Sequence, residues 1–237
     1  EVVWVGAGAI GAGDGRIRLF FADQLPPLAS AFEHPEPPSG DIHQAIRTQL
    51  QQGGASFWGQ LRAATPGATE AELLAALWDL VWAGEVTNDT LAPLRALVGS
   101  GGVRRSATSA AARSRGGRPR PVRLSRLGPP TGAGRWSLVA QLCEPRPTAT
   151  ESAHAAALQL VERHGVLTRE AALAEGVVGG FASVYSVLKV LEERGQLRRG
   201  YFVTGLGAAQ FSLHGAIDRL RSVRELAHGH DALSWPD

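Results

Sequence analysis

Residues 180–194 carry the clearest pattern of apolar and polar positions in the chain. The apolar positions recur at i, i+3, i+7 and i+10, the spacing of one helix face; they are Phe181, Val184, Leu188 and Leu191. The opposite face is polar and consists of Ser183, Ser186, Lys189 and Glu193. We therefore predict a helix whose short polar side chains can enter a groove of DNA.

The neighbouring segments surround this helix with further elements. Two helices are predicted before it and two strand-like runs after it, at 151–164, 168–175, 196–203 and 210–213. This order predicts a winged helix over 148–228. The basic residues Arg194, Arg198 and Arg199 favour contacts with DNA phosphates. A protein-binding winged helix with solvated charges on its wing is the alternative.

A similar layout occurs earlier in the chain. Three helices are predicted there, over 41–52, 56–64 and 69–83. Gly53 and Gly84 are 31 residues apart and Gly165 and Gly195 are 30 apart, so the closing glycines match although the residues between them differ. We predict two winged helices in tandem, the first over 39–99. An accidental likeness between two three-helix segments is the alternative.

The two copies differ in charge. Residues 66–94 contain no lysine or arginine but five acids, Glu70, Glu72, Asp79, Glu85 and Asp89. Such a surface repels phosphates, so the second copy is the better candidate for DNA binding. The third helix of the first copy also carries Trp78 and Trp82, more apolar surface than one small core face needs. We predict that these indoles form an interface with another domain or with a second copy of the chain in a homo-oligomer.

Residues 100–147 are predicted to be a linker rich in Arg, Gly, Pro and Ser. Its first part has no acid, no sustained apolar period and nine arginines: Arg104, Arg105, Arg113, Arg115, Arg118, Arg120, Arg123, Arg126 and Arg135. Without them the chain would hold 15 basic and 22 acidic residues, so the positive charge is concentrated here. We expect the arginines at 104–123 to track the DNA backbone. A solubilising tether is the alternative.

The N-terminal residues 1–38 contain a formal dinucleotide fingerprint. Gly6, Gly8 and Gly11 fit the pattern G-x-G-x-x-G after a strand-like run. A dinucleotide site needs a helix next, because the helix N-terminus faces the pyrophosphate. The chain instead continues into a turn and a second strand-like run at 16–21. We predict a β-hairpin that ends a preceding domain and binds no nucleotide.

Composition limits the remaining functional classes. The 237 residues, 44% of them hydrophobic, can hold two or three small cores. The single cysteine, Cys143, excludes an intrachain disulfide and a cysteine zinc cluster, and we predict neither a metal site nor a cofactor in this chain. With no signal peptide and no long apolar run, we expect a cytoplasmic location and no membrane partner. Because methionine is absent and the chain opens inside a strand-like run, we expect a piece of a longer polypeptide, with 229–237 as a truncated tail.

Long segments of the chain, in order, resemble one protein family. They are EVVWVGAGAIGAGDGRIRLFFAD, LWDLVWAGEVTNDTLAPLRAL, GPPTGAGRWSLV and GVLTREAALAEGVVGGFASVYSVLKVLEERGQLRRGYFVTGLGAAQFSL. These segments are similar to the C-terminal part of the large bacterial helicase-related proteins, Lhr. The resemblance implies an array of winged helices within an ATP-dependent DNA helicase of superfamily 2. It also implies that the ATP and Mg²⁺ sites of this hydrolase lie in upstream helicase domains of the same polypeptide.

The predicted fold is α+β and mostly α, with tandem winged-helix domains, small β-hairpins and an N-terminal β-hairpin. The predicted function is to grip DNA, mainly through its backbone, for a helicase or translocase motor. Two alternatives come from other classes: part of a DNA-repair glycosylase-like module, or an oligomerisation module. The sequence contains no catalytic motif, so no catalytic residue is assigned.

Overall fold

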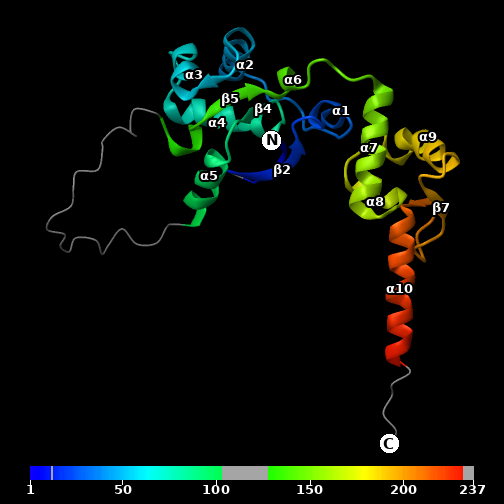
Figure 1. Cartoon of the computed structure of the whole chain (residues 1–237). Coiled ribbons are helices and arrows are strands. Elements are labelled where there is room, and N and C mark those ends of the chain that lie inside the picture. Colours follow the sequence, from blue (N-terminus) through cyan, green and yellow to red (C-terminus); the bar gives the residue numbers. More distant parts are fainter. Residues whose placement is uncertain (12, 103–127, 232–237) are drawn as a thin grey trace, which may run out of the picture. The chain divides into compact units, whose positions relative to one another are not determined.

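The computed structural model describes residues 1–11, 13–102 and 128–231 (Figure 1). These residues form two compact units. Unit 1 consists of Glu1–Leu25 and His34–Glu144, and unit 2 consists of Pro26–Glu33 and Pro145–Asp237. Each unit combines helices with a small antiparallel three-stranded sheet, so the fold is α+β. No helix in the described part of the chain is long and apolar enough to cross a membrane.

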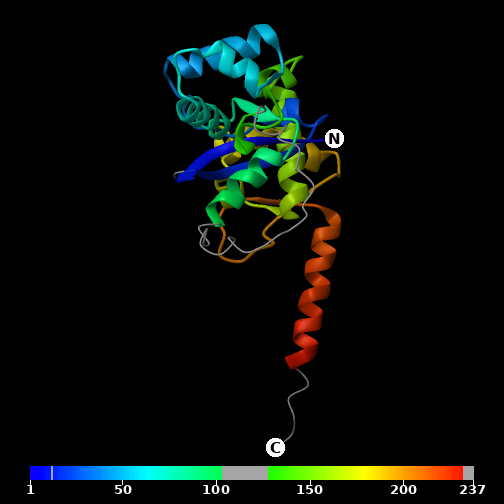
Figure 2. The same cartoon turned by 90° about the vertical axis from the view of Figure 1, so that its left-hand side faces the viewer.

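Unit 2 has the order of elements predicted for 148–228. The elements are α7 (Ala149–His164), β6 (Val166–Leu167), α8 (Arg169–Ala174), α9 (Gly180–Glu193), β7 (Arg198–Gly200), β8 (Gln210–Ser212) and α10 (His214–Asp231). The sheet order is β6-β8-β7, so the last strand pairs with both others. The segment between β7 and β8 is the wing of unit 2, residues 201–209. Helix α10 extends beyond the sheet of unit 2 in both views (Figures 1 and 2).

The helices of unit 2 begin and end where the sequence supplies caps. Thr148 Oγ1 accepts a hydrogen bond from the Glu151 amide (3.2 Å), and Glu151 Oε2 accepts one from the Thr148 amide (2.7 Å). Such a capping box satisfies amides that have no partner inside the helix. At the end of α9, Gly195 adopts φ 72°, a left-handed conformation that glycine tolerates best. The predicted end of this helix is confirmed.

The core of unit 2 lies where α7 and α9 pack together beside the sheet. Val184, Leu188 and Leu191 are buried, as their spacing predicts. The rings of Phe181 and Phe211 lie 6.3 Å apart between centroids, which joins α9 to β8. The apolar face of α9 therefore packs inward and its polar face remains outside.

A short segment near the N-terminus, Pro26–Glu33, belongs to unit 2. This changes the domain predicted for 1–38. Phe32 forms a β-bridge with Val177, and the Val178 amide donates to the Ala31 carbonyl at 3.0 Å. The backbone groups of this segment find their partners beside the loop between α8 and α9. Backbone pairing, rather than nearness in sequence to the hairpin, decides where the segment lies.

Unit 1 contains more elements than the predicted hairpin and three helices. They are β1 (Val2–Gly11), β2 (Asp14–Phe21), α2 (Asp41–Gly53), β3 (Ser56–Phe57), α3 (Trp58–Ala64), α4 (Glu70–Trp82), β4 (Val86–Asn88), α5 (Ala92–Gly102), the 3-10 helix η2 (Pro130–Gly132), β5 (Arg135–Leu138) and α6 (Val139–Leu142). Helix α1 (Leu25–Ala29) follows the hairpin, where the chain passes from unit 1 to unit 2. Strands β1 and β2 pair as the predicted antiparallel hairpin.

Strand β5 changes the interpretation of the predicted linker over 100–147. It lies between β3 and β4 in a sheet of order β3-β5-β4, with Trp136 opposite both Ser56 and Asn88. The segment therefore returns to the sheet of unit 1 instead of leaving it. Units 1 and 2 share the order helix, strand, helix, helix, strand, strand, and in both the last strand is central. In chain order, the residues between β4 and β5 of unit 1, which include the arginine-rich segment, correspond to the wing between β7 and β8 of unit 2.

A cluster of tryptophans fills the core of unit 1. Trp136 is fully buried, and its ring packs edge-on against Trp4 at 6.4 Å and Trp78 at 6.1 Å between centroids. Trp58 and Trp82 belong to the same cluster. Burial of these large rings together contributes a large share of the apolar area of this unit.

The N-terminal hairpin lies directly against α4. A Cβ at Gly6 would lie 1.8 Å from the Val81 carbonyl oxygen, and one at Gly15 would lie 2.4 Å from Trp82 Cε3. Both positions need glycine because the hairpin and the helix approach too closely for a side chain. The Trp4 indole also donates to the Thr90 carbonyl at 3.0 Å. The glycines that resemble a nucleotide fingerprint therefore include one that permits packing against α4.

Candidate nucleic-acid interface

The outward face of α9 consists of the residues that the periodicity predicts. Ser183, Ser186 and Lys189 are exposed. Ser183 Oγ donates to the Gly180 carbonyl at 2.8 Å, so this hydroxyl is engaged in the first turn of the helix. Lys189 Nζ lies 3.7 Å from Glu193 Oε1, and both side chains are more than half exposed. An exposed pair of this kind is weak, so Lys189 can exchange Glu193 for a phosphate at little cost.

The two arginines of β7 do not point the same way. Arg199 pairs with Phe211 and Arg198 pairs with Ser212 in the antiparallel ladder. Directly opposed residues share a face of the sheet, and successive residues alternate between faces. Phe211 packs against Tyr185 of α9 at 5.8 Å between ring centroids, so Arg199 lies on the α9 side of the sheet. Arg198 lies on the other side, which the sequence pattern of two adjacent arginines does not reveal.

The side chain of Gln210 fixes the backbone of the wing. It is fully buried. Its Oε1 accepts hydrogen bonds from the amides of Phe202 and Val203, each at 2.8 Å. Its Nε2 donates to the carbonyls of Val203 at 2.9 Å and Leu206 at 3.3 Å. The wing is therefore held by one amide group, and sequence reasoning missed this residue although a polar side chain just before the apolar Phe211 was the available signal.

The electrostatic character of this surface suits an anionic partner. Arg194 and Arg199 are exposed, as is Arg198 on the other side of the sheet, and no aspartate or glutamate occurs between Arg194 and Asp218. Arg194 caps the C-terminal end of α9. Exposed arginines that protrude from a folded scaffold are well suited to phosphate contacts.

Comparison with known proteins identifies the family. Residues 146–232 match the family model of the winged-helix domain of the large helicase-related protein. Over 94% of its length the chain is 45% identical to the "Lhr helicase/ probable uracil glycosylase" of Mycolicibacterium smegmatis and 38% identical to the "Lhr helicase/uracil glycosylase" of Escherichia coli. The chain belongs to the large helicase-related (Lhr) family. It spans about 15% of the length of these two relatives.

The other residues proposed for DNA contact in this Lhr chain are the linker arginines. They are Arg104, Arg105, Arg113, Arg115, Arg118, Arg120 and Arg123, and all lie outside the described residues. The described ends of the segment are in unit 1, at α5 and η2. Their predicted role in tracking the DNA backbone stays a prediction.

Trp78 and Trp82, predicted to form an interface, are buried within unit 1 at 6% and 7% exposure. Trp78 packs against Trp136, and its indole nitrogen donates to the Thr131 carbonyl at 3.2 Å. Trp82 packs against Gly15 of the hairpin. Other parts of the same chain therefore cover both indoles. The predicted contact with a second copy of the chain stays a prediction.

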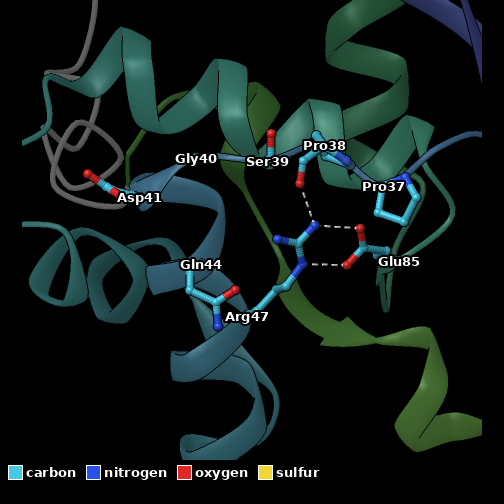
Figure 3. A pocket seen from close by; sticks show the side chains of 8 residues that line it. All are labelled: Pro37, Pro38, Ser39, Gly40, Asp41, Gln44, Arg47 and Glu85. Atoms are coloured by element: carbon cyan, nitrogen blue, oxygen red, sulfur yellow. Dashed lines mark hydrogen bonds and ion pairs between the residues drawn. The ribbon is translucent and has the colours of Figure 1, made fainter.

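An open pocket of about 550 Å³ in unit 1 lies beside α2 (Figure 3). Arg47 there donates to Glu85 through Nε at 2.6 Å and through Nη2 at 2.7 Å, and Nη2 also donates to the Pro38 carbonyl. The hydrogen bonds to Glu85 raise the pKa of Arg47 above its ordinary value. The pair of Arg47 and Glu85 joins α2 to the turn after α4. Because the Arg47 guanidinium is already bound to this carboxylate, the pocket is a weak candidate for binding an anion.

The described residues do not fit a nucleotide or metal site. The glycine-rich segment at Gly6 to Gly11 lies within β1 and leads into β2, so no helix N-terminus faces it. Among the residues that the structure describes, no three His, Cys, Asp or Glu side chains are grouped so as to hold a metal ion.

Proposed function

We propose that this Lhr region binds DNA through unit 2, mainly by contacts with the DNA backbone. The observation that carries the proposal is the arrangement of α9 and β7. The exposed polar face of α9 and the side chain of Arg199 lie on the same side of the sheet, within a winged-helix domain. A helix in the major groove with an adjacent basic wing on the flanking phosphates is a common mode for this fold.

We further propose that unit 1 is also a winged helix and that, unlike unit 2, it does not contact DNA. The shared order of elements and strands favours a tandem pair. Helix α4 takes the position that α9 takes in unit 2, but the hairpin packs against it through Gly6 and Gly15. Its exposed positions include Glu72 and Asp79, which would repel phosphates. We expect that α4, packed against the hairpin on one side and acidic on its exposed side, does not enter a DNA groove.

We place this region in a longer ATP-dependent DNA helicase, whose ATP and Mg²⁺ sites would belong to other domains of the polypeptide. The names of the two relatives, which join a helicase with a uracil glycosylase, support a role in DNA metabolism for such a protein. Base excision would need a group poised beside a flipped base. We assign DNA binding, and not base excision, to this region because the exposed face of α9 and the Arg199 side chain suit contacts with the DNA backbone.

Placing a carboxylate at three matched positions tests the proposal. Ser186→Glu puts a negative charge on the outward face of α9, Ser222→Glu puts one on the exposed surface of α10, and Ala75→Glu puts one on the exposed face of α4. We expect Ser186→Glu to weaken binding to duplex DNA about 10- to 100-fold in fluorescence anisotropy, because the carboxylate would repel the phosphates that the outward face of α9 approaches. The affinities of the other two variants for duplex DNA should remain within about threefold of the wild-type affinity. Equal effects at all three positions, or a selective loss with Ala75→Glu, would contradict the assignment.

A further inference from the structure

Tyr201 is the most exposed large apolar side chain that the structure describes. Its exposure is 81%, and it forms no hydrogen bond or ring contact with another described residue. The other tyrosine of the chain, Tyr185, packs against Phe181 and Phe211, each at 5.8 Å between centroids. The fold of unit 2 therefore uses one tyrosine ring in its core and leaves the other in solvent.

The backbone beneath Tyr201 is fixed. Phe202 packs so closely on Gly200 that a Cβ at Gly200 would lie 2.9 Å from Phe202 Cζ. The amides of Phe202 and Val203 are bound to the buried Gln210 side chain. The Phe202 side chain packs against Gly200, whereas the side chain of its neighbour Tyr201 points into solvent. An aromatic ring held on an ordered backbone loses little entropy when it binds, which favours affinity.

The charges around Tyr201 differ from those around the tryptophans of unit 1. Arg198 and Arg199 precede it by three and two residues, and the wing contains no acid. Trp78 and Trp82, by contrast, are buried on an acidic helix. Aromatic rings interleaved with arginines are typical of proteins that bind single strands, because the rings stack on bases while the cations contact phosphates.

We propose that Tyr201 stacks on an unpaired DNA base, so that the wing of unit 2 binds the junction between duplex and single strand. Inside a duplex the faces of paired bases are covered by their neighbours, so away from the duplex ends the ring finds a stacking partner only where the strand is unpaired. This inference rests on the proposed DNA-binding role of unit 2. It adds that unit 2 prefers duplex DNA with an unpaired strand to fully paired DNA.

The test compares a blunt duplex with the same duplex carrying a single-stranded tail, using the full 237-residue chain. Tyr201→Ala should weaken binding to the tailed DNA about 5- to 100-fold, the range found when stacking aromatics are replaced by alanine, and change blunt-duplex binding less than twofold. Tyr201→Phe keeps the ring and should bind tailed DNA like wild type. Leu173→Ala removes another exposed apolar side chain of unit 2, 74% exposed on α8, and should have no effect.

A base analogue gives a second readout at saturating protein. 2-Aminopurine at the first unpaired position should be quenched by wild type and by Tyr201→Phe but not by Tyr201→Ala, since quenching requires stacking. Equal losses on both DNAs, unchanged binding of the tailed DNA, or quenching that survives in Tyr201→Ala would each overturn the inference. If wild type binds tailed and blunt DNA alike, only this inference fails; if it binds neither, the proposed function fails with it.

Discussion

Replacing Gly6 with alanine tests the packing of the hairpin against α4. The new Cβ would lie 1.8 Å from the Val81 carbonyl oxygen and 2.7 Å from the carbonyl carbon, about half of an ordinary van der Waals distance to the oxygen. Because both contacts are with backbone, the hairpin must move away from the helix. Overpacking of this kind costs about 1–3 kcal/mol. The movement also strains two hydrogen bonds, Trp4 Nε1 to the Thr90 carbonyl and Thr87 Oγ1 to the Trp4 carbonyl, each worth about 0.5–1.5 kcal/mol.

Together these effects predict that Gly6→Ala lowers the free energy of unfolding of unit 1 by about 2–6 kcal/mol and its melting temperature by about 5–25 °C. Thermal unfolding followed by tryptophan fluorescence measures this unit, because five of the six tryptophans lie in its core. Gly11→Ala is the matched control, since no atom lies within 4 Å of its added Cβ. It should leave stability unchanged or raise it by up to about 1 kcal/mol. Melting of Gly6→Ala within about 1 °C of wild type would refute the packing argument.

Two further predictions concern stability. Gln210→Ala removes four hydrogen bonds to the wing and should lower the free energy of unfolding, measured by urea denaturation, by about 2–4 kcal/mol. Replacing the exposed Gln196 with alanine should change this free energy by less than about 0.5 kcal/mol. Equal effects of the two variants would contradict the role of Gln210. Hydrogen bonds from Thr69 and Thr148 lower the pKa of Glu72 and Glu151 below the ordinary 4.5. Their stabilising contribution is therefore present above about pH 4.5 and lost as pH falls through the lower pKa of the folded state. As the pH is lowered across this range, the melting temperature should fall less steeply in Glu72→Gln/Glu151→Gln than in wild type. An unchanged pH dependence would show that the capping boxes Thr69–Glu72 and Thr148–Glu151 do not contribute.

The sequence predicted the parts of the fold that depend on local interactions. The apolar period of α9 and the glycines at its ends locate that helix, and Val184, Leu188 and Leu191 are buried as expected. Gly84 and Gly195 both adopt left-handed conformations after the third helix of their units. These features depend on residues that are close together in the sequence, so they can be predicted without knowledge of the rest of the chain.

The features that the sequence did not predict depend on distant partners. Strand β5 is only four residues long and follows an arginine-rich segment, so nothing local marks Trp136 as the centre of a core. A glycine such as Gly6 gives no positive signal of close packing, since what matters is the side chain that it lacks. The opposite orientations of Arg198 and Arg199 follow from strand pairing with β8. In each case a contact across the chain decides the outcome.

The dependence of DNA affinity on salt tests most directly whether unit 2 holds the DNA backbone. Each phosphate contact with duplex DNA contributes about 0.9 to the slope of log affinity against log salt. If Arg194 and Arg199 contact phosphates, Arg194→Gln/Arg199→Gln should reduce the magnitude of the slope by about 2 for every duplex sequence. Arg198→Gln, on the other face of the sheet, should change it by less than about 0.5. A slope that is the same in the double variant and in wild type would contradict the account.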